Sequence, residues 1–282
     1  MKDAVKAVVN SGVELRVRIP WNKKDKPRVV REALAAGATR IIAGGGDGTI
    51  NAVVNSLVGN GKKPPRAELG ILPLGTANDF ARGCSLPVDN LESCLRIACV
   101  APARAVDVGR MNKRSFINVA SLGFGAEVTA TTSVDMKRHL GGVAYTLMGF
   151  ATALQFSPYS GRLTIPGQDP IPGEMLIAAV GNCRYAGGGF DVAPKASMSD
   201  GLLDLTVIAH DQQFSPARVL QELQDPFNES NQYVTYRQLP EFAFESDAQL
   251  HCNLDGEPVR KRKLRFSVLS KHLSLALPDS HS

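Results

Sequence analysis

The first hundred residues repeat one pattern, in which a short apolar strand leads into a glycine-rich loop and then a helix. Arg40 to Ala43 leads into GGGDGT at residues 44–49, and Ile50 to Val58 has a helical pattern. Leu69 to Leu72 is the next such strand and leads into PLGTANDFARG. This alternation predicts an open α/β sheet of mostly parallel strands with helices on both faces. Further elements are expected as helices at 3–10, 27–37 and 89–100 and a half-buried strand at 13–19, with Gly37 ending its helix.

The second half of the chain is mainly β. Ala105 to Arg110 and Ser115 to Ser121 flank a short polar turn and predict a hairpin. Four more strands are predicted at 175–182, 202–209, 241–245 and 263–270. We therefore expect a nucleotide-binding α/β domain at 1–103 and a β-rich domain at 104–282. The last strand, LSLALP, is compatible with a return to either domain.

Composition excludes a disordered or fibrous chain but does not select a partner. The 282 residues carry a formal charge of +5, a mild preference for anionic partners, and no nucleic-acid-binding module accompanies it. Five cysteines without a paired spacing indicate a reducing cytosol. The uncharged segment Leu140 to Gly161 is interrupted by polar residues, so it predicts a core or interfacial helix rather than a membrane span.

The GGGDGT loop has the composition of a phosphate-binding loop. It lies between a strand and a helix, where main-chain N–H groups and the helix dipole attract an anion. A tight glycine turn without a ligand is the alternative, and glycine repeats alone do not decide between them. Asp47 favours a nucleotide with its magnesium, and Thr49 and Asn51 add polar groups in the first helical turn.

The second loop, around Thr76, follows the next strand. Thr76 is suited either to contact a phosphate or to cap the following helix. Because parallel strands place such loops at the same edge of the sheet, both loops are expected to open toward one crevice. The pair indicates a ligand site more strongly than either loop alone.

These segments resemble a known family. GGGDGTIN and LGILPLGTANDFARG, with FINVASLGFGAEV, GNCRYAGGGFDVAPKASMSDGLLDLTV and NLDGEP, are similar to the diacylglycerol kinase catalytic-domain superfamily and its YegS-like bacterial lipid kinases. The resemblance implies a C-terminal β-sandwich and an ATP- and Mg²⁺-dependent kinase. It also implies Glu257 as the proton acceptor and Thr76 as a nucleotide contact. The remaining implied ATP contacts are Gly46, Asp47, Gly48, Thr49, Ile50, Asn51 and Ala52.

The resemblance also implies a structural divalent ion, Mg²⁺ or Ca²⁺. Asp200 would bind it through its carboxylate, and Ser197 and Leu202 through main-chain oxygens. Two departures from the family pattern predict weaker ATP binding, since Ala52 replaces a glutamate and Pro20 replaces a residue that contacts ATP. In a third departure, the first strand with its polar loop has no counterpart. We expect about 20 in-frame residues upstream to encode it.

The function implied is transfer of the ATP γ-phosphate to a hydroxyl of a membrane lipid, in phospholipid metabolism. The protein would work from the cytoplasm and bind the inner face of the membrane transiently. The basic run from Arg260 to Arg265 predicts either a solvated hairpin or a docking surface for anionic lipid. Gly142 to Phe156 and Phe124 are candidates for a lipid entry path or for ordinary core. Two alternatives remain: a soluble-acceptor kinase of the NAD kinase or phosphofructokinase type, and a catalytically weak nucleotide- and lipid-binding protein.

Overall fold

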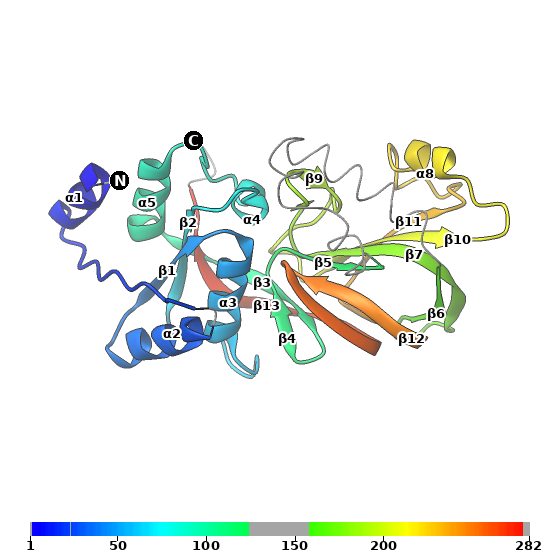
Figure 1. Ribbon diagram of the computed structural model, residues 1–282, viewed down its shortest axis with the longest axis horizontal. Coiled ribbons are helices and arrows are strands. Elements are labelled where there is room, and N and C mark those ends of the chain that lie inside the picture. Colours follow the sequence, from blue (N-terminus) through cyan, green and yellow to red (C-terminus); the bar gives the residue numbers. More distant parts are fainter. Residues whose placement is uncertain (1, 23, 124–157, 279–282) are drawn as a thin grey trace.

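The computed structural model describes residues 2–22, 24–123 and 158–278 (Figure 1). In the first part, helices alternate with two parallel strands, and Figure 1 shows α5 on one side of these strands and α2 with α3 on the other. The elements are α1 (Lys2–Asn10), α2 (Asp25–Ala35), β1 (Arg40–Gly45), α3 (Asp47–Val58), β2 (Glu68–Pro73), α4 (Asp79–Gly83) and α5 (Leu91–Val100). The predicted α/β alternation is confirmed, and α2 ends just before Gly37, whose φ of 86° suits glycine.

The remaining described elements are strands apart from one short helix. They are β3 (Ala103–Met111), β4 (Arg114–Phe116), β5 (Val119–Leu122), β6 (Tyr159–Thr164), β7 (Ile171–Gly181), β8 (Tyr185–Ala186), β9 (Phe190–Asp191), β10 (Leu203–His210), α8 (Pro216–Glu222), β11 (Val234–Leu239), β12 (Glu241–Leu254) and β13 (Glu257–Ala276). The predicted hairpin is confirmed only in its first part, as β3 paired with β4. The rest of its second strand forms β5, which pairs with β7 and β12 instead. The second half is therefore mainly β, as the turn and strand pattern indicated.

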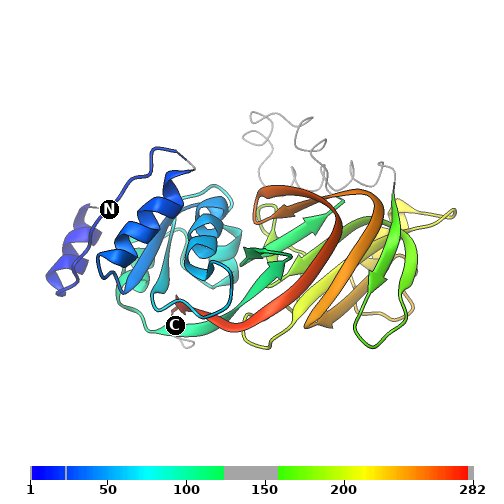
Figure 2. The ribbon, with the colours of Figure 1, turned by 90° about the horizontal axis from the view of Figure 1, so that it is seen from below.

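The long strand β13 joins the two halves. Its first part pairs with β12, and its last part enters the α/β sheet, where Leu275 is the parallel partner of Leu69 (Figure 2). The main strand order is β1-β2-β13-β12-β5-β7-β10-β11. The C-terminal strand thus returns to the first domain, which the sequence left open. The domain boundary near residue 103 stays a prediction.

Apolar cores support both halves. Ile50, Leu69 and Ile71 are fully buried between the helices and the parallel strands. Gly70 permits close packing there, because a Cβ on it would lie 2.5 Å from the carbonyl oxygen of Ala98 in α5. In the β-rich half, the ring of Phe266 stacks on Phe242 at 5.1 Å. Each half therefore has its own packed interior, and β13 fixes one against the other.

The strand predicted at 13–19 is wrong. Residues 13–20 are irregular, and the side chains of Val17, Ile19 and Trp21 are 68%, 69% and 90% exposed. Alternating apolar residues stabilise a strand only when a neighbouring strand accepts its hydrogen bonds and covers its apolar face. In the described part of the chain, β1 ends the strand order and pairs with β2 alone, so this segment has no such neighbour.

Several expectations concern residues outside the described ranges. Phe124 and Gly142 to Phe156 lie there, together with most of the uncharged segment Leu140 to Gly161. Within the described ranges, no helix is both long and apolar enough to cross a membrane. The roles assigned to these residues stay predictions.

Candidate active site

The GGGDGT loop connects β1 to α3 with its main-chain donors at the start of the helix. Gly46 is the N-cap residue in an extended conformation, and its carbonyl accepts hydrogen bonds from Thr49 N at 2.8 Å and Ile50 N at 3.1 Å. Gly45 must lack a side chain, because a Cβ there would lie 2.6 Å from Oγ1 of Thr49. The loop therefore presents backbone rather than side chains at the positive end of α3.

The two loops predicted to share a crevice lie against each other. The amide of Leu74 donates to the carbonyl of Gly45 at 3.1 Å, and a Cβ on Gly75 would lie only 2.4 Å from Cα of Gly46. Asn78 closes the second loop by accepting a hydrogen bond from Gly75 N at 2.8 Å. Thr76 is exposed at the tip of this loop. Its contact with a nucleotide stays a prediction.

Asp47 has a role that the sequence did not reveal. Its carboxylate accepts hydrogen bonds from Asp79 N at 3.3 Å and Phe80 N at 3.0 Å, at the start of α4. Helix α4 has only five residues, too few for a helical pattern to show in the sequence. An acid in the first loop and a short helix after the second therefore hold the two loops together.

The carboxylate of Asp79 links α4 to the β-rich half. It accepts hydrogen bonds from Gly188 N at 2.9 Å and Gly189 N at 2.7 Å, in the turn between β8 and β9. Burial raises the pKa of Asp79, and these two hydrogen bonds oppose the shift. The local sequence feature that could have indicated this contact is the run of three glycines that begins at Gly187. Their positive φ angles allow the turn to direct the amides of Gly188 and Gly189 at the Asp79 carboxylate.

Asp255 and Gly256 form the turn between β12 and β13. Both have positive φ angles, 48° and 95°, and Leu254 pairs directly with Glu257, as in a two-residue hairpin of type I′. The carboxylate of Asp255 is buried and accepts hydrogen bonds from the amides of Ile117 at 2.7 Å, Val119 at 2.9 Å and Asn118 at 3.1 Å. Burial raises the pKa of Asp255 to about 6, against the lowering effect of these bonds.

A hydrogen bond from α3 completes the environment of Asp255. Nδ2 of Asn51 donates to the Asp255 carboxylate at 2.8 Å. Asn55, one turn later on α3, accepts a hydrogen bond from Ser115 N in β4 at 3.0 Å. The hairpin that carries Glu257 is therefore fixed to the helix that follows the GGGDGT loop.

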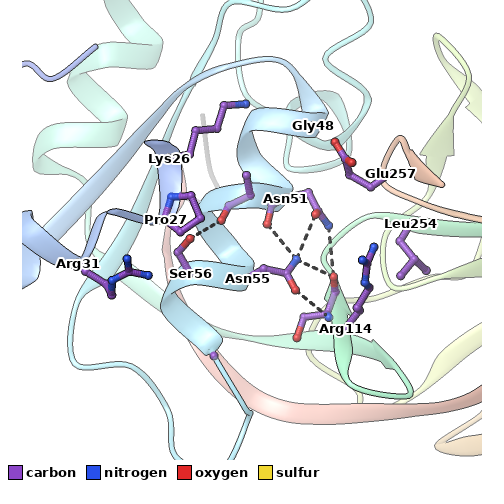
Figure 3. Close-up of a pocket in the computed structure, with 13 residues that line it drawn as sticks. Lys26, Pro27, Arg31, Gly48, Asn51, Asn55, Ser56, Arg114, Leu254 and Glu257 are labelled. Carbon is purple, nitrogen blue, oxygen red and sulfur yellow. Dashed lines mark hydrogen bonds between the residues drawn. The ribbon is translucent and has the colours of Figure 1, made fainter. Parts of the chain in front are cut away.

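Glu257 lies at a cavity of about 650 Å³ between the two halves. Figure 3 shows its carboxylate pointing toward Gly48 at the start of α3. Among the residues singled out from the sequence, Gly48, Asn51, Ala52 and Glu257 line this cavity. Thr49 borders it, since its hydroxyl accepts a hydrogen bond from Lys26 Nζ at 3.2 Å.

Other predicted nucleotide contacts lie in different surroundings. The side chain of Ile50 is fully buried in the core, so only its backbone is available to a ligand. Ala52 presents a methyl group at the cavity, where the resemblance implies a glutamate. Pro20 is half-buried in the irregular segment before α2.

The predicted metal ligands lie outside the cavity, in the loop before β10. Oδ1 of Asp200 accepts a hydrogen bond from Leu202 N at 3.0 Å, and the hydroxyl groups of Ser197 and Ser199 are 3.1 Å apart. Asp107 fixes the loop by accepting a hydrogen bond from Gly201 N at 2.7 Å. One carboxylate with main-chain carbonyls fits a hard cation such as Mg²⁺ or Ca²⁺ in chemistry. Among the described residues, no three His, Cys, Asp or Glu side chains form a metal-binding group.

Two glycine loops at the ends of parallel strands, a helix N-terminus and a carboxylate across a cavity define a nucleotide-dependent phosphotransferase. The comparisons with known proteins agree. The diacylglycerol kinase catalytic domain family matches residues 1–111, and the YegS C-terminal NAD kinase beta sandwich-like domain family matches residues 118–277. The second match confirms the sandwich that the resemblance implied for the C-terminal half.

Curated relatives match the chain almost throughout. A protein of Chromohalobacter salexigens named "Probable lipid kinase YegS-like" is 44% identical, and the match covers 99% of this chain and 89% of that protein. A Pseudomonas aeruginosa protein of the same name is 41% identical, with 99% and 89% covered. The crystal structure of a diacylglycerol kinase from Bacillus anthracis str. Sterne, 20% identical, has the same fold with a TM-score of 0.73 over 99% of this chain and 89% of that one.

The chain therefore belongs to the diacylglycerol kinase catalytic-domain superfamily, among the YegS-like lipid kinases. It is a kinase of the lipid-kinase type that uses ATP as its co-substrate.

Proposed function

We propose that the protein phosphorylates a hydroxyl of a membrane lipid and acts in phospholipid metabolism. The observation that carries the proposal is the position of Glu257, whose carboxylate points across the cavity toward the start of α3. A phosphate held at that helix N-terminus and a hydroxyl beside Glu257 would face each other. The names of the relatives at 38–44% identity support a lipid as the acceptor.

In this mechanism the segment Gly46 to Ala52 and Thr76 bind ATP. Main-chain amides at the start of α3, with the helix dipole, stabilise negative charge on the phosphates. Glu257 accepts the proton of the acceptor hydroxyl as its oxygen attacks the γ-phosphorus and the bond to ADP breaks. Such a base contributes about 10²–10⁴-fold to the rate.

Metal ions complete the proposal. Asp200, with main-chain oxygens of Ser197 and Leu202, would hold a structural Mg²⁺ or Ca²⁺ in the loop that Asp107 fixes. Magnesium bound with ATP would neutralise charge on the transferred phosphoryl group.

We further propose that the basic run on β13 docks on anionic membrane from the cytoplasmic side. Arg260, Lys261, Arg262, Lys263 and Arg265 are all exposed. Lys263 forms an ion pair with Glu245, which also pairs with Arg162. Each basic side chain near an anionic leaflet contributes about 1 kcal/mol, so the run would give weak, reversible binding.

The test is incubation of the purified protein with labelled ATP and Mg²⁺, in parallel with lipid vesicles and with soluble hydroxyl acceptors. We expect labelled lipid only in the vesicle reactions. Label in soluble acceptors irrespective of vesicles would support the soluble-acceptor kinase instead. ATP binding without any labelled product from a total bacterial lipid extract would support the catalytically weak binding protein.

A further inference from the structure

The cavity extends well beyond the point where Glu257 faces the start of α3. Residues of α3 and its C-cap Gly59 form the floor, and they share one face of the helix because they recur at three- or four-residue spacing. They are Gly48, Asn51, Ala52, Asn55, Ser56 and Gly59. At about 1.5 Å per residue this face is about 16 Å long, which exceeds the size of one transferred phosphoryl group.

The side chains of the floor are small, and those of Asn51, Asn55 and Ser56 are polar. Its largest side chains, Asn51 and Asn55, are engaged in hydrogen bonds with Asp255 and Ser115. Ser56 donates its hydroxyl to the carbonyl of Ala52 at 2.7 Å. A floor of such small side chains leaves space for a ligand group over α3.

The walls of the cavity are cationic. Lys26 and Arg31 from α2 stand on one side and Arg114 from β4 on the other (Figure 3). Among the lining residues that the structure describes, Glu257 carries the one carboxylate. The ammonium group of Lys26 is fixed beside the first turn of α3 by its hydrogen bond to Thr49. In the described part of the chain, no carboxylate forms an ion pair with Arg31 or Arg114, whereas Arg28 on α2 pairs with Glu32 at 2.8 Å.

We propose that this cavity is a phosphate-binding subsite, in which Lys26, Arg31 and Arg114 bind a phosphate group that stays on its carrier during the reaction. That phosphate has two candidate sources: the α- or β-phosphate of the nucleotide, or a phosphodiester in the headgroup of an anionic acceptor lipid. Lysine and arginine are the side chains suited to both. The assignment of these sources rests on the proposed function.

A binding measurement tests the subsite without catalysis. Inorganic pyrophosphate is titrated calorimetrically into the full chain and into the triple variant K26Q/R31Q/R114Q. The control R28Q/K62Q/K113Q removes the same charge at residues that do not line the cavity. We expect the triple variant to bind at least about tenfold more weakly than the control, since each lost contact is charge-assisted. Affinities within twofold of each other would overturn the proposal.

Single substitutions at exposed residues guard against a triple variant that fails to fold. Arg31 and Arg114 are both exposed, so R31Q and R114Q are used singly where the triple variant does not keep the circular dichroism spectrum of the parent. Each single variant is expected to lose about threefold in pyrophosphate affinity. Unchanged binding in both would count against the subsite.

Kinetics then identify the source of the phosphate. The KM for ATP and the KM for acceptor are measured with vesicles containing phosphatidylglycerol or diacylglycerol. A raised KM for ATP with both acceptors assigns the phosphate to the nucleotide. A raised KM for phosphatidylglycerol with an unchanged KM for diacylglycerol assigns it to the acceptor headgroup. KM values equal to those of the control variant overturn the subsite proposal. Absence of turnover with any lipid overturns the proposed function. In that case the pyrophosphate titration still decides whether the subsite exists.

Discussion

The side-chain amide of Asn51 donates a hydrogen bond of 2.8 Å to the buried carboxylate of Asp255. Asn51 lies in the first half of α3, and Asp255 forms the turn that precedes Glu257. Because Asp255 also accepts three main-chain hydrogen bonds from residues 117–119, the hairpin has one position relative to α3. The distance between the GGGDGT loop and the proposed base is therefore set by this pair.

Replacing Asp255 should disturb this geometry. In Asp255→Asn the side-chain NH₂ group would face N–H donors that the carboxylate now accepts. We therefore expect a loss of about 2–4 kcal/mol in the free energy of unfolding and a lower kcat. Urea denaturation and initial rates measure the two effects. Asp169→Asn, at an exposed turn, is the control. Stability and kcat equal to those of the control would show that Asp255 does not position the hairpin.

The contact between the two loops predicts the effect of a single methyl group. A Cβ on Gly75 would lie 2.4 Å from Cα of Gly46, so Gly75→Ala must push the loops apart. We expect a loss of about 1–3 kcal/mol in stability and weaker ATP binding. In Gly173→Ala the new methyl group meets no atom within 4 Å, so this variant serves as the control. A Gly75→Ala protein that binds ATP like the control would contradict the contact.

Asp79 should protect the turn between β8 and β9 from exchange. Its carboxylate holds the amides of Gly188 and Gly189, so Asp79→Ala frees both. We expect hydrogen exchange at these two amides to accelerate at least about tenfold while β12 and β13 keep their protection. Mass spectrometry of exchanged peptides reads both regions. Asp89→Ala, at an exposed position, should leave the turn protected, and equal exchange in the two variants would rule out the link.

How much of this could be predicted from the sequence depends on the range of the interactions. The strand-loop-helix units around β1 and β2 follow from local apolar pattern and glycine, and the structure confirms them. The hydrogen bond between Asp79 and Gly188 could not be predicted in this way. Its two partners are distant in the chain, and a buried carboxylate has no local sequence signature. The strand expected at 13–19 failed for a similar reason, since pairing depends on a neighbour and not on the segment itself.

The pH dependence of stability should reveal Asp204. Burial raises the pKa of its carboxyl to about 6 from 3.8, against the hydrogen bonds from Tyr236 and Gln238, and its Oδ2 is buried without a partner among the described residues. Since the folded pKa is above the unfolded one, protonation stabilises the fold fully below about pH 4, and this contribution is lost as pH rises through 6.

Asp204→Asn removes that titration. We expect the difference in unfolding free energy between parent and variant to be larger at pH 4 than at pH 7.5, by about 2 kcal/mol. Urea denaturation at both values measures it. Asp89→Asn, at an exposed residue, should show no such difference. If the unfolding free energy of the parent minus that of the variant increased with pH, the sign would be opposite to the one expected, and this account of Asp204 would be refuted.

The most direct test of the account concerns Glu257 itself. The full chain, Glu257→Gln and the control Glu241→Gln are compared for binding of an ATP analogue and for transfer of labelled phosphate to lipid vesicles. The account predicts that Glu257→Gln folds and binds the analogue like the parent but loses about 10²–10⁴-fold in kcat, while the control keeps its rate. Unimpaired lipid phosphorylation by Glu257→Gln would contradict the assignment of Glu257 as the base.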